Sequence, residues 1–194
     1  MRTNSIMLAG ALAIAVAGCS SSDNEASNDL TIDNSVGTDM SANDTNPASA
    51  DATMPTDAAG FANMVAASDM YEIESGKLAA DRAASADVKS FAAQLQTDHS
   101  KSTADLKAAA QGAGITVTPA LDAEKQGMLD ALKAAKGDDF DRLFIDQQTT
   151  AHQKALQLLQ NYASAGDKDA LKAFATKATA VVEGHLNHLN GIKK

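Results

Sequence analysis

From residue 57 onward, apolar side chains recur every three or four positions, the spacing that places them on one face of an α-helix. Alanine is abundant there together with Leu, Lys, Gln and Glu, all of which favour helix. Almost no stretch alternates apolar and polar residues as a half-buried strand does. The pattern therefore predicts four long helices, with a shorter helix between the second and the third. The predicted segments are 57–84, 85–112, 118–137, 138–166 and 167–191.

Residues that cap helices set these boundaries. Ser85 is the predicted N-cap of the second helix, and Thr118-Pro119 gives the short helix a cap followed by proline at its first position. Asp138 and Asp141 have the spacing of a capping box, and Asp167 is the predicted cap of the last helix. Four long helices joined by short turns predict an all-α bundle with up-down-up-down topology.

The first two long helices each place one ionisable residue on a face that is mostly apolar. Successive residues rotate by about 100° around a helix, so this face follows from spacing alone. In the first helix the face passes through Met64, Ser68 and Glu72. In the second helix His99 lies at its centre, with Asp98 at its edge. We therefore expect a carboxylate and an imidazole to point into the bundle.

The last two long helices contribute a histidine each. His152 lies near the margin of an apolar arc, one turn after Gln148, and His185 shares a face with the apolar residues of the final helix. Glu72, His99 and His152 all fall near the middle of their helices and are expected to meet at one level. His185 comes later in its helix, so it is expected about two turns out of register.

Histidine and carboxylate side chains on facing helices can be interpreted in two ways. Bundles build metal sites from such residues, and His with carboxylate suits iron, zinc, copper or manganese, so a site for one transition-metal ion is one interpretation. The preferred interpretation needs no cofactor: the imidazoles form hydrogen bonds with Glu72, Asp98, Gln148 or Tyr162 and fix the register of the helices. In both cases a buried Glu72 requires a partner.

The sequence argues against an oxygen-activating di-iron centre. Such a centre takes a Glu-x-x-His pair from each of two helices. Here the residues three positions before the interior histidines are Gln96, Thr149 and Val182. The sequence also lacks a Gly-x-Ser-x-Gly turn and a glycine-rich phosphate loop, so neither a serine hydrolase nor a nucleotide-binding enzyme is indicated.

The N-terminus resembles that of a bacterial lipoprotein. An apolar stretch over residues 6–17, too short to span a bilayer, leads to Val16-Ala17-Gly18-Cys19. We predict a signal peptide at 1–18 and lipidation of Cys19. The alternative is an ordinary secretory peptide cut near Ala17 or Gly18, which would leave the only cysteine of an exported chain as an unpaired thiol. By resemblance to lipoprotein sorting, Ser20 after the cysteine favours the outer membrane, with the domain facing the periplasm from the inner leaflet.

Residues 19–56 are predicted to be a disordered acidic tether between this anchor and the folded domain at 57–194. The segment consists mainly of Ser, Asn, Asp, Thr and Ala, which cannot bury enough apolar surface to offset the entropy lost on ordering. It carries seven acidic residues and no Lys or Arg, so most of the net charge of −9 lies here. The domain has no basic patch with interleaved aromatic residues, which argues against nucleic acid as a partner.

Several short motifs, taken in order, resemble one bacterial exported family. They are Met70-Tyr71-Glu72-Ile73-Glu74-Ser75-Gly76-Lys77-Leu78-Ala79, Phe91-Ala92, Asp98-His99, Asp139-Phe140-Asp141, Ala151-His152-Gln153 and a late His185. The family is catalogued as domain of unknown function 4142 and is often labelled predicted outer membrane protein. The resemblance covers residues 61–189 and implies a ferritin-like four-helix bundle. It carries the family's polar positions onto Glu72, Asp98-His99, Ala151-His152-Gln153 and His185, and it brings no established catalytic activity.

Three functional hypotheses follow. The first is a lipid-anchored, non-enzymatic binding or envelope-stress protein, and the sequence favours it. The alternative is a metal-binding or metal-dependent redox protein that uses Glu72, His99, His152 and His185, with Asp98, Gln148 and Gln153 as supporting polar residues. In the third, an exposed helix face docks another protein of the envelope.

Overall fold

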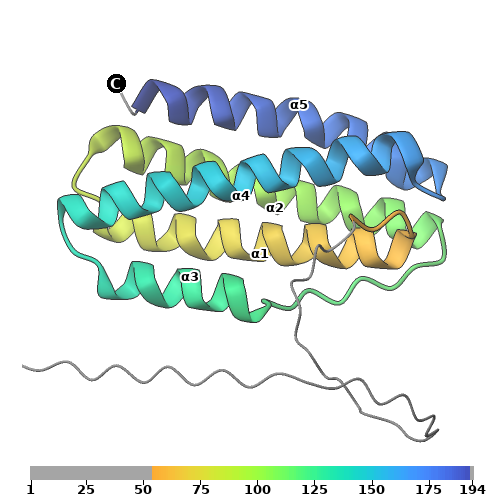
Figure 1. Cartoon of the computed structure of the whole chain (residues 1–194), viewed down its shortest axis with the longest axis horizontal. Helices are drawn as coiled ribbons and strands as arrows, with labels where there is room; N and C mark the ends of the chain where they lie inside the picture. Colours follow the sequence, from red (N-terminus) through yellow and green to blue (C-terminus); the bar gives the residue numbers. More distant parts are fainter. Residues whose placement is uncertain (1–53, 193–194) are drawn as a thin grey trace, which may run out of the picture. The chain divides into compact units, whose positions relative to one another are not determined.

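The computed structural model describes residues 54–192, which form five α-helices (Figure 1). The predicted signal peptide, Cys19 and nearly all of the predicted tether lie outside the described residues. No helix within 54–192 combines the length and the apolar character needed to cross a membrane. The helices are α1 (Ala58–Arg82), α2 (Ala86–Gly112), α3 (Ala123–Ala134), α4 (Asp138–Ala165) and α5 (Asp169–Ile192).

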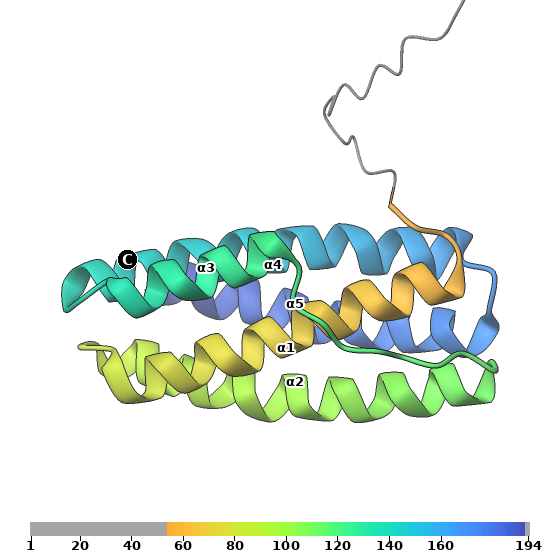
Figure 2. The same cartoon turned by 90° about the horizontal axis from the view of Figure 1, so that it is seen from below.

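The four long helices form a bundle in which α1 packs mainly on α2, and α4 mainly on α5. The pairs α2 with α5 and α1 with α4 close the bundle, and α3 lies outside against α1 and α4 (Figures 1 and 2). This confirms the predicted all-α, ferritin-like bundle with a short extra helix. Direction alternates along all five helices. Because α3 returns along the bundle, α4 begins at the same end as α2, and each long helix is antiparallel to both of its neighbours.

The end of the bundle where α4 begins is held by two charged side chains. Arg82, at the end of α1, donates to the carbonyl oxygens of Leu132, Lys133 and Ala135 at the C-terminus of α3, at 3.1, 2.7 and 2.6 Å. The carboxylate of Asp141 accepts from the backbone N–H groups of Ala84 and Ser85, at 3.1 and 2.7 Å.

The second of these interactions corrects the predicted role of Asp141. Asp138 and Asp141 do not form a capping box, since the N-cap of α4 is Gly137 at φ 54°, with no hydrogen bond from a side chain. The reason is a contact with a part of the chain that is distant in sequence. The first turn of α4 lies against the turn between α1 and α2, where two backbone donors would otherwise lack partners, and Asp141 accepts from both of them.

The short helix begins at Ala123 and not at the predicted Thr118-Pro119. Asp122 is its N-cap and accepts from the backbone N–H of Lys125 at 2.8 Å. Residues 115–121 alternate between half-buried and exposed, as extended chain does, and Ile115 and Val117 pack against the core. Contact with the core therefore keeps this connection extended beyond the predicted cap.

The last helix also begins later than predicted. Asp167 does not cap it; its carboxylate accepts from the hydroxyl of Tyr162 at 2.9 Å. The carbonyl of Lys168 accepts the first backbone bonds instead, from Leu171 and Lys172, and the helix starts at Asp169. By contrast, the predicted Ser85 cap of α2 is confirmed, since its hydroxyl accepts from the backbone of Asp87 and Val88.

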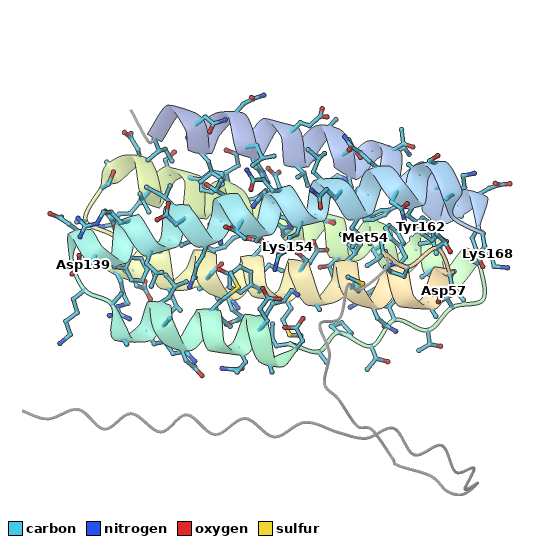
Figure 3. All side chains as sticks on the ribbon, viewed as in Figure 1. Met54, Asp57, Asp139, Lys154, Tyr162 and Lys168 are labelled. Carbon is cyan, nitrogen blue, oxygen red and sulfur yellow. The ribbon has the colours of Figure 1, made fainter. Side chains whose placement is uncertain are left out.

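The apolar core consists of two clusters separated by a polar layer. The two clusters occupy opposite ends of the bundle; Tyr162 lies near Asp57 and Lys168 at one end, and Asp139 lies at the other (Figure 3). Their largest members are Phe61, Leu106, Leu159, Tyr162, Leu171 and Phe174 at one end, and Phe91, Leu95, Leu132, Phe140, Phe144 and Leu189 at the other. Buried polar side chains of all four long helices fill the space between them.

Asp141→Ala should lower the free energy of unfolding by about 1–3 kcal/mol, because two backbone donors lose a charged acceptor. Asp139→Ala is the matched control: Asp139 is in the same turn but is exposed, and it pairs with Arg142. The control should change stability by less than about 0.5 kcal/mol. Guanidinium unfolding of both variants measures the difference, and equal effects would contradict the assigned role of Asp141.

Candidate metal centre

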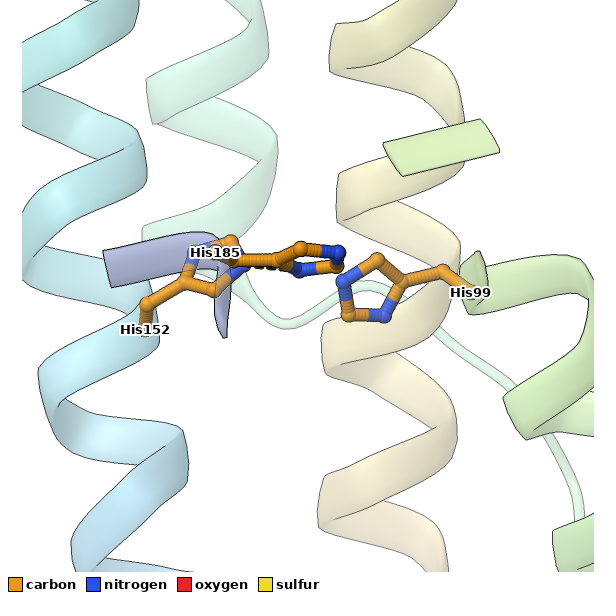
Figure 4. Close-up of side chains that lie close together, drawn as sticks. All are labelled: His99, His152 and His185. Atoms are coloured by element: carbon orange, nitrogen blue, oxygen red, sulfur yellow. Dashed lines mark hydrogen bonds between the residues drawn. The ribbon is translucent and has the colours of Figure 1, made fainter. Parts of the chain in front are cut away.

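Three histidines from three helices meet in the central polar layer. His99 of α2, His152 of α4 and His185 of α5 are 7, 1 and 1 % exposed. One nitrogen from each ring lies within 4.8 Å of the other two, and the rings converge between the helices (Figure 4). This is the group of potential metal ligands that the described part of the chain contains.

A backbone carbonyl fixes the tautomer of His152. Its Nδ1 lies 2.8 Å from the carbonyl oxygen of Gln148, one turn earlier in α4. Because a carbonyl only accepts, Nδ1 carries the hydrogen, and the lone pair of a neutral ring is on Nε2. That Nε2 lies 3.0 Å from Nδ1 of His185. Burial, together with the nearby His99 and His185 rings, lowers the pKa of His152 to about 3, which keeps the ring neutral.

A carboxylate orients His185 in a similar way. Its Nε2 lies 2.9 Å from Oδ2 of Asp98, so this nitrogen donates and a neutral ring has its lone pair on Nδ1. The contact between Nδ1 and His152 is then a hydrogen bond only if His185 is protonated at both nitrogens. Burial lowers the pKa of His185 in spite of Asp98. In the neutral state two lone pairs face each other, an arrangement that a cation would relieve.

His99 completes the pattern through Asp69. Nδ1 of His99 lies 2.8 Å from Oδ1 of Asp69, whose other oxygen accepts from the hydroxyl of Thr103 at 3.1 Å. Nε2 of His99 is buried and has no hydrogen-bond partner among residues 54–192. Each of the three rings thus has one nitrogen held by a carboxylate or carbonyl oxygen, while the second nitrogens of His152 and His185 face each other and that of His99 has no partner among residues 54–192. Metal-ligating histidines are oriented by such hydrogen bonds.

The protonation of His99 differs from that of the other two rings. Burial opposes its charged form, but the hydrogen bond to Asp69 and the carboxylates of Glu72 and Asp98 outweigh that effect, so the pKa of His99 is raised. A protonated His99 would leave its Nε2–H without an acceptor among the described residues. A metal ion at this position would have to displace that proton.

Glu72 and Gln148 border the three rings. Oε1 of Glu72 lies 3.8 Å from Nδ1 of His152, while its Oε2 is buried without a partner within the described chain. Burial raises the pKa of Glu72 to about 7, although the nearby His99 acts in the opposite direction. Nε2 of Gln148 donates to the hydroxyl of Ser75 at 2.9 Å, and its Oε1 has no partner there.

The structure brings most of the predicted site residues together. Asp98 and Gln148 contact the cluster directly, and Glu72 lies beside it. Gln153 is exposed on α4 and does not reach the polar layer. The position expected for His185 was wrong. In two antiparallel helices, residues equally far from the connecting turn lie at the same level. His152 is the thirteenth residue before the end of α4 at Ala165, and His185 is the sixteenth after the start of α5 at Asp169. The three-residue difference is about 4.5 Å along the helix axis, which is less than one turn.

Sequence reasoning missed Asp69. The predicted apolar face passed through Met64 and Ser68, but Met64 is 43 % exposed and Asp69 is only 2 % exposed. Two signals in the sequence point to Asp69. It follows Val65 by four residues and precedes Glu72 by three, which puts it on the buried face. It is also the thirteenth residue before the end of α1, just as His99 is the thirteenth after the start of α2.

Comparison with known proteins identifies the family. A family model described as domain of unknown function (DUF4142) matches residues 43–192. The chain belongs to this family. No curated protein matches it. The three histidines, Asp69 and Asp98 therefore lie within the part of the chain that defines a DUF4142 domain.

Three solved structures share the fold of this DUF4142 domain. CopM in a silver-bound form has a TM-score of 0.58 and 20 % identity, and covers 70 % of this chain and 93 % of its own. CopM in a Cu(II)-bound form has a TM-score of 0.60 and 18 % identity, with coverages of 70 and 94 %. A DUF305 fragment from Deinococcus radiodurans has a TM-score of 0.62 and 13 % identity, with coverages of 70 and 93 %. At these identities the likeness establishes a common helical bundle.

Glu72→Gln should remove a pH-dependent loss of stability in the metal-free protein. Because the folded state raises the pKa of Glu72 from 4.5 to about 7, the stabilising contribution of its protonated form is complete below pH 4.5 and is lost as the pH rises through 7. The free energy of unfolding of the variant, relative to that of the wild type, should therefore rise by about 3 kcal/mol as the pH is raised from 4 to 8. Urea unfolding in EDTA measures the gain. Glu74→Gln, at an exposed position, should show no such pH-dependent gain. If the stability difference between Glu72→Gln and the wild type did not change with pH, the raised pKa of Glu72 would be refuted.

Proposed function

We propose that this domain binds one divalent transition-metal ion through His99, His152 and His185, as a non-enzymatic metal-binding protein of the cell envelope. The observation that carries the proposal is the arrangement of hydrogen bonds around the three rings. Asp69, the Gln148 carbonyl and Asp98 each hold one ring nitrogen, one nitrogen from each ring lies within 4.8 Å of the other two, and the three rings converge between the helices (Figure 4). A packing network alone does not require all three free nitrogens to face a common point.

The size of the cluster fits a metal after a small adjustment. Metal–imidazole bonds of about 2.0–2.1 Å place ligand nitrogens roughly 3–4 Å apart. The His152 and His185 nitrogens are 3.0 Å apart, and the full set lies within 4.8 Å, so a movement of about 1 Å brings the ligands into range. Three imidazoles suit copper, zinc, nickel or iron.

Charge favours a divalent ion. The carboxylates of Asp69 and Asp98 accept hydrogen bonds from ligand rings, and Glu72 is also beside the cluster. With neutral imidazoles these carboxylates leave the layer negative, and the charge on Asp69, which is only 2 % exposed, is costly unless it is compensated. A divalent cation compensates Asp69 and Asp98 through the rings that they hold. The silver and Cu(II) bound to CopM, which shares the fold, are consistent with a site of this kind.

The proposal includes the compartment. The Val16-Ala17-Gly18-Cys19 motif supports lipidation at Cys19, and Ser20 supports retention at the outer membrane with the domain in the periplasm. In that setting the domain would buffer or store metal ions close to the membrane. A redox enzyme remains the second candidate, since copper or iron held by three histidines can exchange electrons.

The first test is metal stoichiometry. The full chain with Cys19→Ser, which removes the only thiol, should retain close to one Cu(II) or Zn(II) per chain after dialysis, as measured by elemental analysis. His152→Ala should reduce retention at least about tenfold, because loss of one of three ligands costs more than about 1.4 kcal/mol. His188→Ala is the matched control, since His188 bonds to Gln94 at the surface. A folded wild type without metal, or equal losses in both variants, would refute the proposal.

The second test is the pH dependence of affinity. Protons compete with the metal for His99, whose pKa is raised, so affinity should fall as the pH falls through that pKa. Asp69→Asn removes a charge that raises the pKa, so the midpoint of this loss should move to lower pH. Affinity at pH 8 should also fall, by about 10–100-fold, because the hydrogen bond that orients His99 is weakened. Competition titrations with a chromophoric chelator measure both effects, and an unchanged midpoint would argue against His99 as a ligand.

A further inference from the structure

A cavity of about 490 Å³ lies between α2 and α5, on one side of the histidine cluster. Its inner wall contains Asp69, His99 and Asp98, so the cavity and the cluster share residues. Elsewhere the wall is mostly apolar, with Val65, Leu158, Leu159, Phe174 and Val182 contributing from the core. The volume is far above the roughly 10–15 Å³ that a single water requires.

The small size of the facing side chains keeps this seam open. Ser102, Ala108 and Ala109 of α2 face Ala170, Ala173 and Ala178 of α5 across the cavity. The other seams of the bundle are different. The pairs α1 with α2 and α4 with α5 pack more extensively, and α3 covers the seam between α1 and α4 (Figure 2). Among residues 54–192, no helix covers the seam between α2 and α5.

Asp98 joins the cavity to the cluster. Its side chain is 34 % exposed and lines the cavity, while its Oδ2 lies 2.9 Å from Nε2 of His185. The other two acceptors that hold the rings are far less accessible: Asp69, on the inner wall, is 2 % exposed, and Gln148 is 0 % exposed and does not line the cavity. A cation that enters the cavity therefore meets the Asp98 carboxylate before the histidines. At the rim, Lys101 pairs with Asp105, and Lys177 adds a positive charge.

We infer that metal ions reach and leave the histidines through the cavity between α2 and α5, and that Asp98 is their transit ligand. This inference rests on the proposed function. His99 lines the cavity and turns a free Nε2 toward the cluster, so it lies next along the route. When the metal ion moves from Asp98 to the three imidazoles, it exchanges a solvated carboxylate ligand for enclosed nitrogen ligands. Divalent copper and zinc favour such nitrogen ligands.

Val181 is the position at which to block the route. It is 44 % exposed, lines the cavity and lies one turn before His185, so a larger side chain there fills the cavity near Asp98 without disturbing the core. Met64 provides the matched control, because it is also a large apolar residue, 43 % exposed, and is not part of the cavity wall. Ser102→Leu obstructs the cavity from the α2 side and serves as a second variant.

The experiment uses the full chain with Cys19→Ser and Cu(II) as the probe. Stopped-flow absorbance gives the uptake rate, and mixing with excess EDTA gives the release rate. Val181→Trp and Ser102→Leu should slow both by about tenfold and leave affinity nearly unchanged, because affinity is the ratio of the two rates. Met64→Trp should leave both rates as in the wild type. Unchanged rates in folded, metal-binding cavity variants overturn the route, whereas a wild type that binds no Cu(II) refutes the proposed function instead.

The role of Asp98 has its own readout. If its charge guides the cation, the uptake rate of the wild type should fall with ionic strength, and Asp98→Asn should be slower at low salt with a flatter salt dependence. If Asp98 only orients His185, the substitution should speed release and leave the salt dependence of uptake unchanged. The second result would overturn the assignment of Asp98 as the transit ligand.

Discussion

The bundle depends on one constraint: a layer of ionisable side chains is enclosed between two apolar clusters, and each buried polar atom needs a partner there. Asp69 satisfies it by accepting from His99 and Thr103, and Asp98 by accepting from His185. These carboxylates decide which nitrogen of each ring carries hydrogen. The same bonds that make burial tolerable therefore decide where the lone pairs point.

The two helix hairpins place this layer with little help from the rest of the chain. In the hairpin of α1 and α2, Asp69 and His99 are equally far from the connecting turn, and in that of α4 and α5, His152 and His185 differ by less than one turn. Each hairpin thus sets the level of one polar pair. Closure of the bundle then joins the pairs, through Asp98 with His185 and through Glu72 beside His152. The anchoring of α4 by Asp141 fixes how the second hairpin meets the first.

The sequence predicts what depends on local spacing and misses what depends on distant contacts. The existence and order of the helices, and the inward direction of His99, His152 and His185, follow from helical periodicity. The role of Asp141 does not, because its donors lie 56 and 57 residues away in the chain. The late start of α3 also escapes local rules, since the core holds the preceding segment extended. Asp69 could have been predicted by counting residues from the turn between α1 and α2.

The unpartnered atoms of the polar layer bear on the choice between packing and metal binding. Nε2 of His99, Oε2 of Glu72 and Oε1 of Gln148 have no partner among residues 54–192, and each such atom costs about 1–3 kcal/mol. Apolar residues of similar volume would commonly give a more stable core. A network that served only to fix helix register would gain from satisfying these atoms, whereas a site for a cation must leave lone pairs free. One of these atoms belongs to His99, and the other two belong to residues that border His152, and this concentration of unpartnered atoms is the physical reason to propose a metal ion as the missing partner.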